Sequence, residues 1–307
     1  MIFPGQGSQT VGMGLLLNRT FPESREVFQA ADAALGEPLS RLIFAGPEQE
    51  LALTANTQPA VMTVSIAAWQ ALRRRGIAAD FLAGHSLGEY TALVAAGSMS
   101  FADAVRLVRL RGSYMQQALP AGEGAMAAVM GLDLEQVRQA CKESEGADVV
   151  SAANMNSPDQ TVIAGHARAV GRAADACRRR GAKRVVMLPV SAPFHCSLME
   201  PARARLERDI GRVDLREAQI PIITNFGAQP VRSAAELREA LVRQVTSPVQ
   251  WVESVRRLVS EGVDTFVEVG PGRVLSGLVR RIDRTVRVAN VEDPDSLAQT
   301  LSLLKAA

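Results

Sequence analysis

The chain has 307 residues, of which 47% are hydrophobic and 21% are charged, and its formal net charge is +2 at pH 7. This length and composition predict a globular protein with one large domain, or with a domain that contains a smaller inserted one. The weak net charge and the presence of only two Trp and two Tyr residues do not favour nucleic-acid binding.

The sequence also gives expectations about compartment and metal content. No apolar stretch approaches the length that spans a bilayer, and the N-terminus lacks the basic and apolar regions of a secretory signal. The three cysteines show no CxxC spacing, which is typical of free thiols in a reducing compartment. We therefore expect a cytoplasmic protein without membrane association. The three histidines lack the spacing of metal ligands, so no metal site is expected.

The first 120 residues alternate between helices and short strands. A helix is expected from about Gln58 to Arg75, a short strand at 81–83 and a small-residue helix at 89–96. A further helix follows Ser100, a favourable N-cap, and runs to about Leu119. This alternation predicts a parallel sheet that is covered by helices.

Residues 121–190 follow a different order. We expect strands at 125–130, 149–154, 161–164 and 184–190, helices at 133–141 and 168–180, and a turn at 156–159. Asp133 and Gln136 form a capping pair for the first helix, and Gly181 ends the second. The order β-α-β-β-α-β is that of a ferredoxin-like unit, which we place as an insertion.

The first pattern resumes after Pro193. We expect a helix at 199–209, a strand at 220–224, a helix that Ser233 and Glu236 cap and Pro248 ends, and a buried strand at 265–269. Residues 1–120 and 191–307 are therefore predicted to form one α/β core, interrupted by the ferredoxin-like subdomain at 121–190.

The pentapeptide Gly84-His85-Ser86-Leu87-Gly88 fits the pattern G-x-S-x-G. An apolar strand precedes it and a helix follows it, which is the setting of a nucleophile elbow. The helix N-terminus favours negative charge that develops at Ser86. The alternative is a glycine-bounded helix start with an N-capping serine; the strand and helix context favours the elbow.

His195 is the best candidate for a general base. It ends a proline-bounded segment, 189–195, that leaves a strand and is not expected to be helical. The alternative is a surface histidine in a loop, which is our interpretation of His166. His85 is adjacent to the candidate nucleophile, but neighbouring side chains diverge at a tight turn, so we treat it as a residue that lines the site.

No Asp or Glu stands out as a third member of a triad. Gln244 lies in the last turn of its predicted helix, where backbone carbonyl groups lack helical partners. Its carbonyl oxygen could accept the Nδ1 proton of His195 and fix the tautomer of the ring.

Arg111 falls on the apolar stripe of its predicted helix, with Ala104, Val108 and Met115 at helical spacing. A buried guanidinium needs a partner, because an unpaired buried charge is very costly. One alternative is a structural ion pair with a buried Asp or Glu. The other is a fork that is kept open for the carboxylate of a substrate.

Several motifs together resemble a known family, the malonyl-CoA:acyl-carrier-protein transacylases of bacterial fatty acid synthesis. They occur in the family's order over nearly the whole chain: Phe3-Pro4-Gly5-Gln6-Gly7-Ser8-Gln9, Gly84-His85-Ser86-Leu87-Gly88-Glu89-Tyr90, Arg109-Leu110-Arg111-Gly112, Asn154-Met155-Asn156-Ser157-Pro158, Pro193-Phe194-His195 and Glu268-Val269-Gly270-Pro271-Gly272. The resemblance implies an α/β-hydrolase-like core with an inserted ferredoxin-like subdomain.

The resemblance also implies an activity and roles at matching positions. The enzyme would transfer malonyl from malonyl-CoA to the phosphopantetheine thiol of acyl carrier protein through a malonyl-serine intermediate, as a monomer without cofactor. Ser86 would be the nucleophile, with His195 as base and Gln244 orienting it. The backbone N–H groups of Gln6 and Leu87 would form the oxyanion hole. The substrate-binding residues would be Arg111, His85, Met115, Asn156 and Phe194, the last of which would disfavour branched acyl groups.

Other functions remain open on the sequence alone. A loading subunit of malonate decarboxylase or a trans-acting polyketide acyltransferase would carry similar motifs. An α/β-type hydrolase is disfavoured because Arg111 has no clear use there, and a catalytically dead carrier-binding scaffold is disfavoured by the intact Ser86 and His195. A basic cluster at 178–184 fits either a solvated helix end or a docking surface for an acidic carrier protein.

Overall fold

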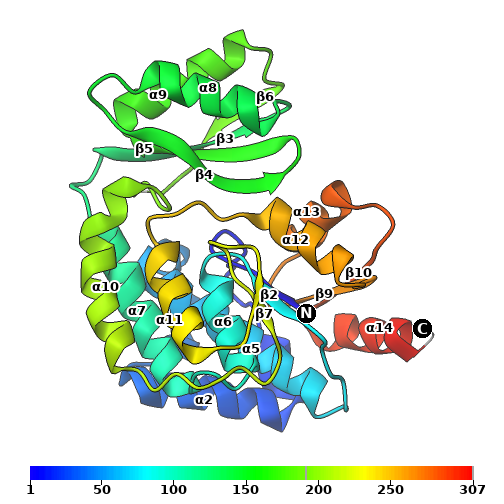
Figure 1. The fold of residues 1–307 in the computed structure, drawn as a ribbon. Helices are drawn as coiled ribbons and strands as arrows, with labels where there is room; N and C mark the ends of the chain where they lie inside the picture. The colour runs from blue at the N-terminus through cyan, green and yellow to red at the C-terminus, as the bar shows by residue number, and fades with distance from the viewer. Residues whose placement is uncertain (191, 306–307) are drawn as a thin grey trace.

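The computed structural model describes residues 1–190 and 192–305 of the chain. Within these residues the strands form a six-stranded sheet and a separate four-stranded sheet. The smaller sheet and its helices form a unit that lies across the core at the top of Figure 1. In the described ranges, no helix has both the length and the apolar character needed to cross a membrane.

The larger sheet is parallel except at one edge. Its order is β10-β9-β1-β2-β7-β8, and only β8 runs antiparallel to its neighbour. The strands are β1 (Ile2–Phe3), β2 (Leu82–Gly84), β7 (Ile222–Ile223), β8 (Pro230–Val231), β9 (Thr265–Val269) and β10 (Arg287–Val291). Since β1, β2, β7 and β9 point the same way, the loops after them meet at one edge of the sheet, where ligands bind in open α/β sheets.

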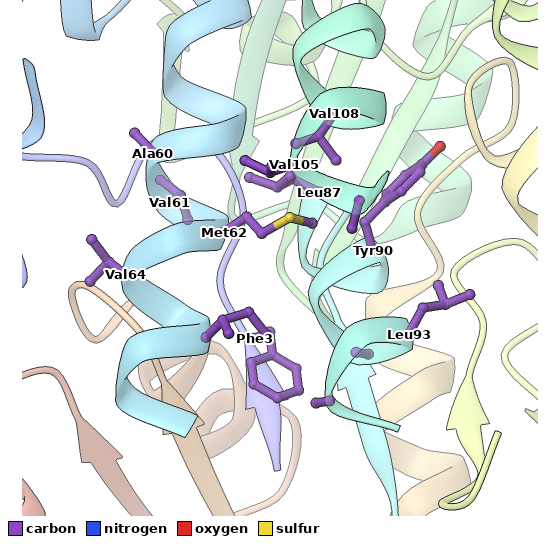
Figure 2. Close-up of a cluster of buried hydrophobic side chains, with 14 of the residues drawn as sticks. Phe3, Ala60, Val61, Met62, Val64, Leu87, Tyr90, Leu93, Val105 and Val108 are labelled. Atoms are coloured by element: carbon purple, nitrogen blue, oxygen red, sulfur yellow. The ribbon is translucent and has the colours of Figure 1, made fainter. Parts of the chain in front are cut away.

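Helices surround this sheet. They are α1 (Leu15–Thr20), α2 (Pro22–Leu35), α3 (Leu39–Ala45), α4 (Glu48–Leu51), α5 (Thr54–Arg73), α6 (Leu87–Ala95), α7 (Phe101–Gln117), α10 (Glu200–Arg212), α11 (Ala234–Gln244), α12 (Trp251–Ser260), α13 (Val274–Ile282) and α14 (Pro294–Lys305), with a 3₁₀ turn at Ser197–Met199. Figure 2 shows side chains of α5, α6 and α7 packed around Phe3 of β1, in the largest cluster of buried apolar residues. This packing fixes α6 and α7, which carry candidate site residues.

Helix α5 differs from its predicted start. It begins at Thr54, so that Pro59 lies inside it. A proline in this position leaves the carbonyl of residue 55 without its helical partner. Close packing against α7 stabilises the extra turn, because Gly112 lies directly against Thr54 and Ala55, with no room for a side chain at position 112.

The smaller sheet is antiparallel, with the order β4-β5-β3-β6. Its unit runs β3 (Gly124–Met130), α8 (Leu134–Ser144), β4 (Val150–Ser157), β5 (Gln160–His166), α9 (Ala167–Arg179) and β6 (Arg184–Met187), which is the predicted β-α-β-β-α-β order. Alternating residues of β3 face opposite sides: Ala127 and Val129 pack under α8 and α9, whereas Met126 and Ala128 join the core cluster. Helices α8 and α9 therefore cover the outer face only (Figure 1).

Strand β4 joins the smaller unit to the core. The predicted turn at 156–159 was placed too early, because Asn156 and Ser157 continue the strand. The extension is stabilised by a parallel bridge: Met155 N–H donates to the Val249 carbonyl at 3.0 Å, and Val249 N–H donates to Ala153 at 2.8 Å. As a result, Asn156 faces the carboxyl edge of the main sheet.

Candidate active site

Ser86 lies on a sharp turn between β2 and α6. Its φ of 52° and ψ of −104° are a strained backbone conformation for a residue with a side chain. The turn closes tightly, since a Cβ at position 84 would lie 1.9 Å from the Gly88 carbonyl carbon, and one at position 88 would lie 2.1 Å from the Phe3 carbonyl oxygen. The two glycines of the G-x-S-x-G pattern are thus required by the close approach of β1, β2 and α6.

Ser86, His195 and Gln244 form a hydrogen-bonded chain. Ser86 Oγ lies 2.7 Å from His195 Nε2, and His195 Nδ1 lies 2.9 Å from the backbone carbonyl oxygen of Gln244. Because a carbonyl only accepts, Nδ1 carries the proton and Nε2 accepts from the serine hydroxyl. Burial, and secondly the nearby Arg111 guanidinium, lower the pKa of His195 to about 3. The ring is therefore neutral at pH 7 and able to accept a proton.

Arg111 is 1% exposed and reaches the nucleophile. Its Nη2 donates to Ser86 Oγ at 3.0 Å and to Gln244 Oε1 at 2.9 Å, and its Nη1 donates to Gln58 Oε1 at 2.8 Å. In the described part of the chain, Arg111 has no carboxylate partner, and its Nε is buried without an acceptor. The guanidinium is thus not held by a structural ion pair. This favours the other alternative, in which Arg111 binds the carboxylate of a substrate.

The two predicted oxyanion-hole donors line the same pocket. Gln6 follows β1, and Leu87 is the first residue of α6. Neither backbone N–H is engaged in a hydrogen bond among residues 1–190 and 192–305. The side chain of Gln6 is fixed by a hydrogen bond in which its Nε2 donates to Thr54 Oγ1 at 3.2 Å.

The structure brings together all ten predicted site residues. Gln244 lies behind the pocket, in contact with His195. The other nine line the pocket: Gln6, His85, Ser86, Leu87, Arg111, Met115, Asn156, Phe194 and His195. His85 Nε2 lies 2.8 Å from Asn156 Oδ1, and its ring stacks at a tilt on Trp251, with centroids 5.6 Å apart. The contact between His85 and Asn156 joins the nucleophile elbow to β4 of the smaller unit. The side of the pocket formed by that unit is mainly apolar.

Three residues that contribute to this arrangement were missed from the sequence: Gln58, Glu89 and Asn225. Gln58 orients Arg111 from α5, and its Nε2 lies 3.7 Å from Met115 Sδ. Asn225 follows β7 at the carboxyl edge of the sheet, a position that could have marked it. Glu89 lies in the motif Gly84–Tyr90, but the spacing of residues in that motif does not indicate that its side chain is buried.

The arrangement suits covalent acyl transfer. It provides a serine nucleophile, a neutral imidazole base that the Gln244 carbonyl orients, and a buried cation for an anionic acyl group. It also provides two backbone N–H groups that have no acceptor within the described part of the chain. Over the described residues, no group of three or more His, Cys, Asp or Glu side chains is placed to hold a metal ion.

Comparison with known proteins agrees with this chemistry. Residues 1–300 match the family model described as acyl transferase domain. The malonyl CoA-acyl carrier protein transacylase of Bacillus subtilis is 47% identical over 99% of this chain and 96% of its own length, and that of Escherichia coli K12 is 46% identical over 98% of both.

Solved structures are equally similar. An acyl carrier protein S-malonyltransferase from Vibrio cholerae superposes with a TM-score of 0.95 at 44% identity, covering 97% of this chain and 98% of that chain. A malonyl-transacylase in complex with a type II PKS acyl-carrier protein superposes with a TM-score of 0.97 at 46% identity, covering 99% and 98%.

Proposed function

The chain belongs to the malonyl-CoA:acyl-carrier-protein transacylases of the acyl transferase domain family, and from this premise we propose how its site moves a malonyl group between two thiols. The enzyme transfers malonyl from malonyl-CoA to the phosphopantetheine thiol of acyl carrier protein, and so supplies malonyl carrier protein for fatty acid synthesis. The observation that carries the mechanism is the Ser86–His195–Gln244 chain beside the buried Arg111.

In the first half-reaction, Ser86 Oγ attacks the thioester carbonyl of malonyl-CoA while its proton passes to His195 Nε2. The oxyanion is held by the N–H groups of Gln6 and Leu87, and one such donor typically contributes about 2.7–4 kcal/mol. The intermediate collapses by breaking the C–S bond, and the coenzyme A sulfur leaves with the proton from His195. The carbonyl of Gln244 stabilises the transient imidazolium.

In the second half-reaction, the carrier's thiol gives its proton to His195 and attacks the malonyl ester. The C–O bond to Ser86 breaks, and the serine oxygen takes the proton back. The net result is thioester exchange without a cofactor. Throughout, the malonyl carboxylate pairs with Arg111, whose present partners in the described ranges are neutral oxygens.

Substitution of Arg111 tests this assignment. Arg111→Ala removes the only partner proposed for a desolvated carboxylate, so malonyl loading of Ser86 should lose at least about 2–5 kcal/mol of transition-state stabilisation. Acetyl loading from acetyl-CoA should be spared or rise, because acetyl leaves no charge unpaired. Single-turnover rates with the two thioesters measure both, and an equal loss for the two acyl groups would make Arg111 a purely structural residue.

A second candidate acceptor is a carrier protein of polyketide synthesis, because a similar malonyl-transacylase forms a complex with a type II PKS acyl-carrier protein. Transfer rates to a fatty-acid carrier and a polyketide carrier, measured side by side from the same malonyl-enzyme, distinguish the two. We also propose that the enzyme acts as a monomer, since the described residues contain every group of the mechanism within one chain. We propose a cytoplasmic location as well, because the cysteines show no CxxC spacing and are typical of free thiols in a reducing compartment.

A further inference from the structure

A buried carboxylate lies beneath the nucleophile, where the mechanism above does not use it. Glu89 is in the first turn of α6, three residues after Ser86, and is 0% exposed. It does not line the substrate pocket, so it cannot contact the reacting atoms. Burial raises its pKa to about 7. Burying a carboxylate is costly unless hydrogen bonds or a charged partner compensate it.

One oxygen of the Glu89 carboxylate accepts two hydrogen bonds. Oε2 accepts from Gln244 Nε2 at 2.7 Å and from the backbone N–H of Asn225 at 3.0 Å. Oε1 is buried and has no partner among residues 1–190 and 192–305. The carboxylate thus fixes two residues that come from α11 and from the loop after β7, far from it in the sequence.

These two residues hold the peptide groups on both sides of Ser86. Asn225 Oδ1 accepts from Ser86 N–H at 2.6 Å, and its Nδ2 donates to the Gly84 carbonyl at 2.6 Å. Gln244 Nε2 donates to the Ser86 carbonyl at 2.9 Å. Because Ser86 has a strained φ of 52°, its conformation depends on such external support.

The amide of Gln244 connects Glu89 to Arg111 as well. Its Nε2 faces Glu89, and its Oε1 therefore faces the guanidinium, from which it accepts at 2.9 Å. An amide turned the other way would direct N–H groups at Arg111. The orientation of Gln244 set by Glu89 thus gives Arg111 an acceptor without giving it a competing carboxylate.

We propose that Glu89 is a positioning residue for the transfer reaction, which holds Ser86 and Arg111 in place through Asn225 and Gln244. The inference rests on the proposed function. This role requires an acceptor atom at the distance from the backbone that a glutamate side chain provides. It does not require the charge, because Oε2 accepts both hydrogen bonds whether or not Oε1 carries a proton.

Three substitutions separate the effect of side-chain length from that of the negative charge: Glu89→Ala, Glu89→Asp and Glu89→Gln. Glutamine keeps an acceptor at the same reach without the charge, and aspartate keeps the charge without the reach. We expect the alanine and aspartate variants to lower the saturating rate of Ser86 loading by about 10- to 100-fold, the scale expected for a nucleophile displaced by about 1 Å. Glu89→Gln should stay within about threefold of the wild type.

Selectivity gives a readout that general loss of stability does not move. The ratio of malonyl to acetyl loading should fall at least about threefold in Glu89→Ala and Glu89→Asp, and should be kept in Glu89→Gln, because Arg111 loses its fixed acceptor only in the first two. Asp32→Ala is a matched control: that carboxylate accepts two hydrogen bonds from Ser40, between α2 and α3. It should lower the melting temperature without changing the ratio.

The loading rates and the selectivity of these variants decide whether Glu89 positions Ser86 and Arg111. Wild-type rates and selectivity in Glu89→Ala or Glu89→Asp, or a Glu89→Gln variant as slow as the alanine variant, would overturn it. If the alanine variant does not fold, the glutamine and aspartate variants still give opposite expectations. Failure of the proposed function is separate, because the wild-type enzyme would then acquire no malonyl group on Ser86 at all.

Discussion

At the scale of single residues, burial has opposite consequences for two side chains of the pocket: it favours the neutral form of His195 and disfavours the charged form of Arg111. His195 is buried and neutral, and Arg111 is buried with neutral partners among the described residues. Both states suit a reaction that brings a carboxylate to Arg111 and a proton to His195. The buried guanidinium of Arg111 is thus an unfavourable charge in the free enzyme, and the carboxylate of the substrate would compensate it.

The state of His195 predicts the pH dependence of loading. Below its pKa the imidazole is protonated and cannot accept the serine proton, so a pKa lowered to about 3 moves the acid limb of the profile to lower pH. The kcat/KM for loading from malonyl-CoA should therefore stay level from about pH 8 to about pH 5. Single-turnover rates across this range, with circular dichroism to monitor folding, measure it. An inflection near 6.5 would mean that His195 is not desolvated as described.

The sequence indicated residues that the structure places in the pocket where a motif or a periodicity marked the side chain. Ser86 is marked by the glycines around it, and Arg111 by its place on an apolar stripe. Glu89 and Asn225 could not be found in this way, because their importance lies in hydrogen bonds between segments more than 130 residues apart. Such contacts depend on how β7 and α11 are placed, which local patterns do not determine.

At the scale of elements, the turn between β2 and α6 is constrained by close packing against β1. Strand β1 has only two residues in the structure, yet it pairs with both β2 and β9 in the middle of the sheet. The carbonyl group of Phe3, the last residue of β1, lies against Gly88. The position of the nucleophile therefore depends on contact between three elements.

Substitution of Gly88 tests this dependence. In Gly88→Ala the added Cβ would lie 2.1 Å from the Phe3 carbonyl oxygen, so α6 must shift. Overpacking of this kind typically costs about 1–3 kcal/mol, and we expect a lower melting temperature together with slower malonyl loading. Gly277→Ala on α13 is the control, since its Cβ meets nothing within 4 Å and should be neutral or stabilising. Equal behaviour of the two variants would contradict the account of the elbow.

Elements were predictable where caps or alternation were strong. Strand β9 has its predicted bounds, and the capping box of Asp133 and Gln136 forms at α8. The helices between residues 15 and 51 were not predicted, and neither were α12, α13, β10 and α14. Three of the first four helices are only four to seven residues long, too short for a clear helical period, and they pack on α5.

At the scale of the whole molecule, the pocket lies between the two sheets. The core supplies the nucleophile, base and cation, and the smaller unit supplies Asn156 and apolar side chains such as Met126 and Val162. The hydrogen bonds between β4 and Val249 fix the two units to each other next to Gln244. A carrier protein must deliver its thiol to this junction.

The basic cluster at 178–184 is one candidate for the carrier's docking surface. Arg178 and Arg180 pair with Asp175 and Glu143, whereas Arg179 and Lys183 are exposed and take part in no ion pair within the described ranges. Changing Arg179 and Lys183 to Glu should raise the KM for an acidic carrier, most clearly at low ionic strength, because exposed charges act on encounter and are screened by salt.

The half-reactions provide the control for this prediction. Loading from malonyl-CoA does not involve the carrier and should be unchanged in the double variant. A loss confined to loading would reassign the cluster to the phosphates of coenzyme A. Unchanged rates in both half-reactions would leave the cluster as a solvated helix end.

The central claim is that malonyl passes through an ester on Ser86. The most direct measurement is intact-protein and peptide mass spectrometry of the enzyme after brief incubation with malonyl-CoA, removal of free thioester and addition of holo acyl carrier protein. We predict one malonyl group on Ser86, its disappearance as the carrier gains the same mass, and no adduct in Ser86→Ala. A malonyl group on another residue, or transfer to the carrier by Ser86→Ala at the wild-type rate, would contradict the mechanism.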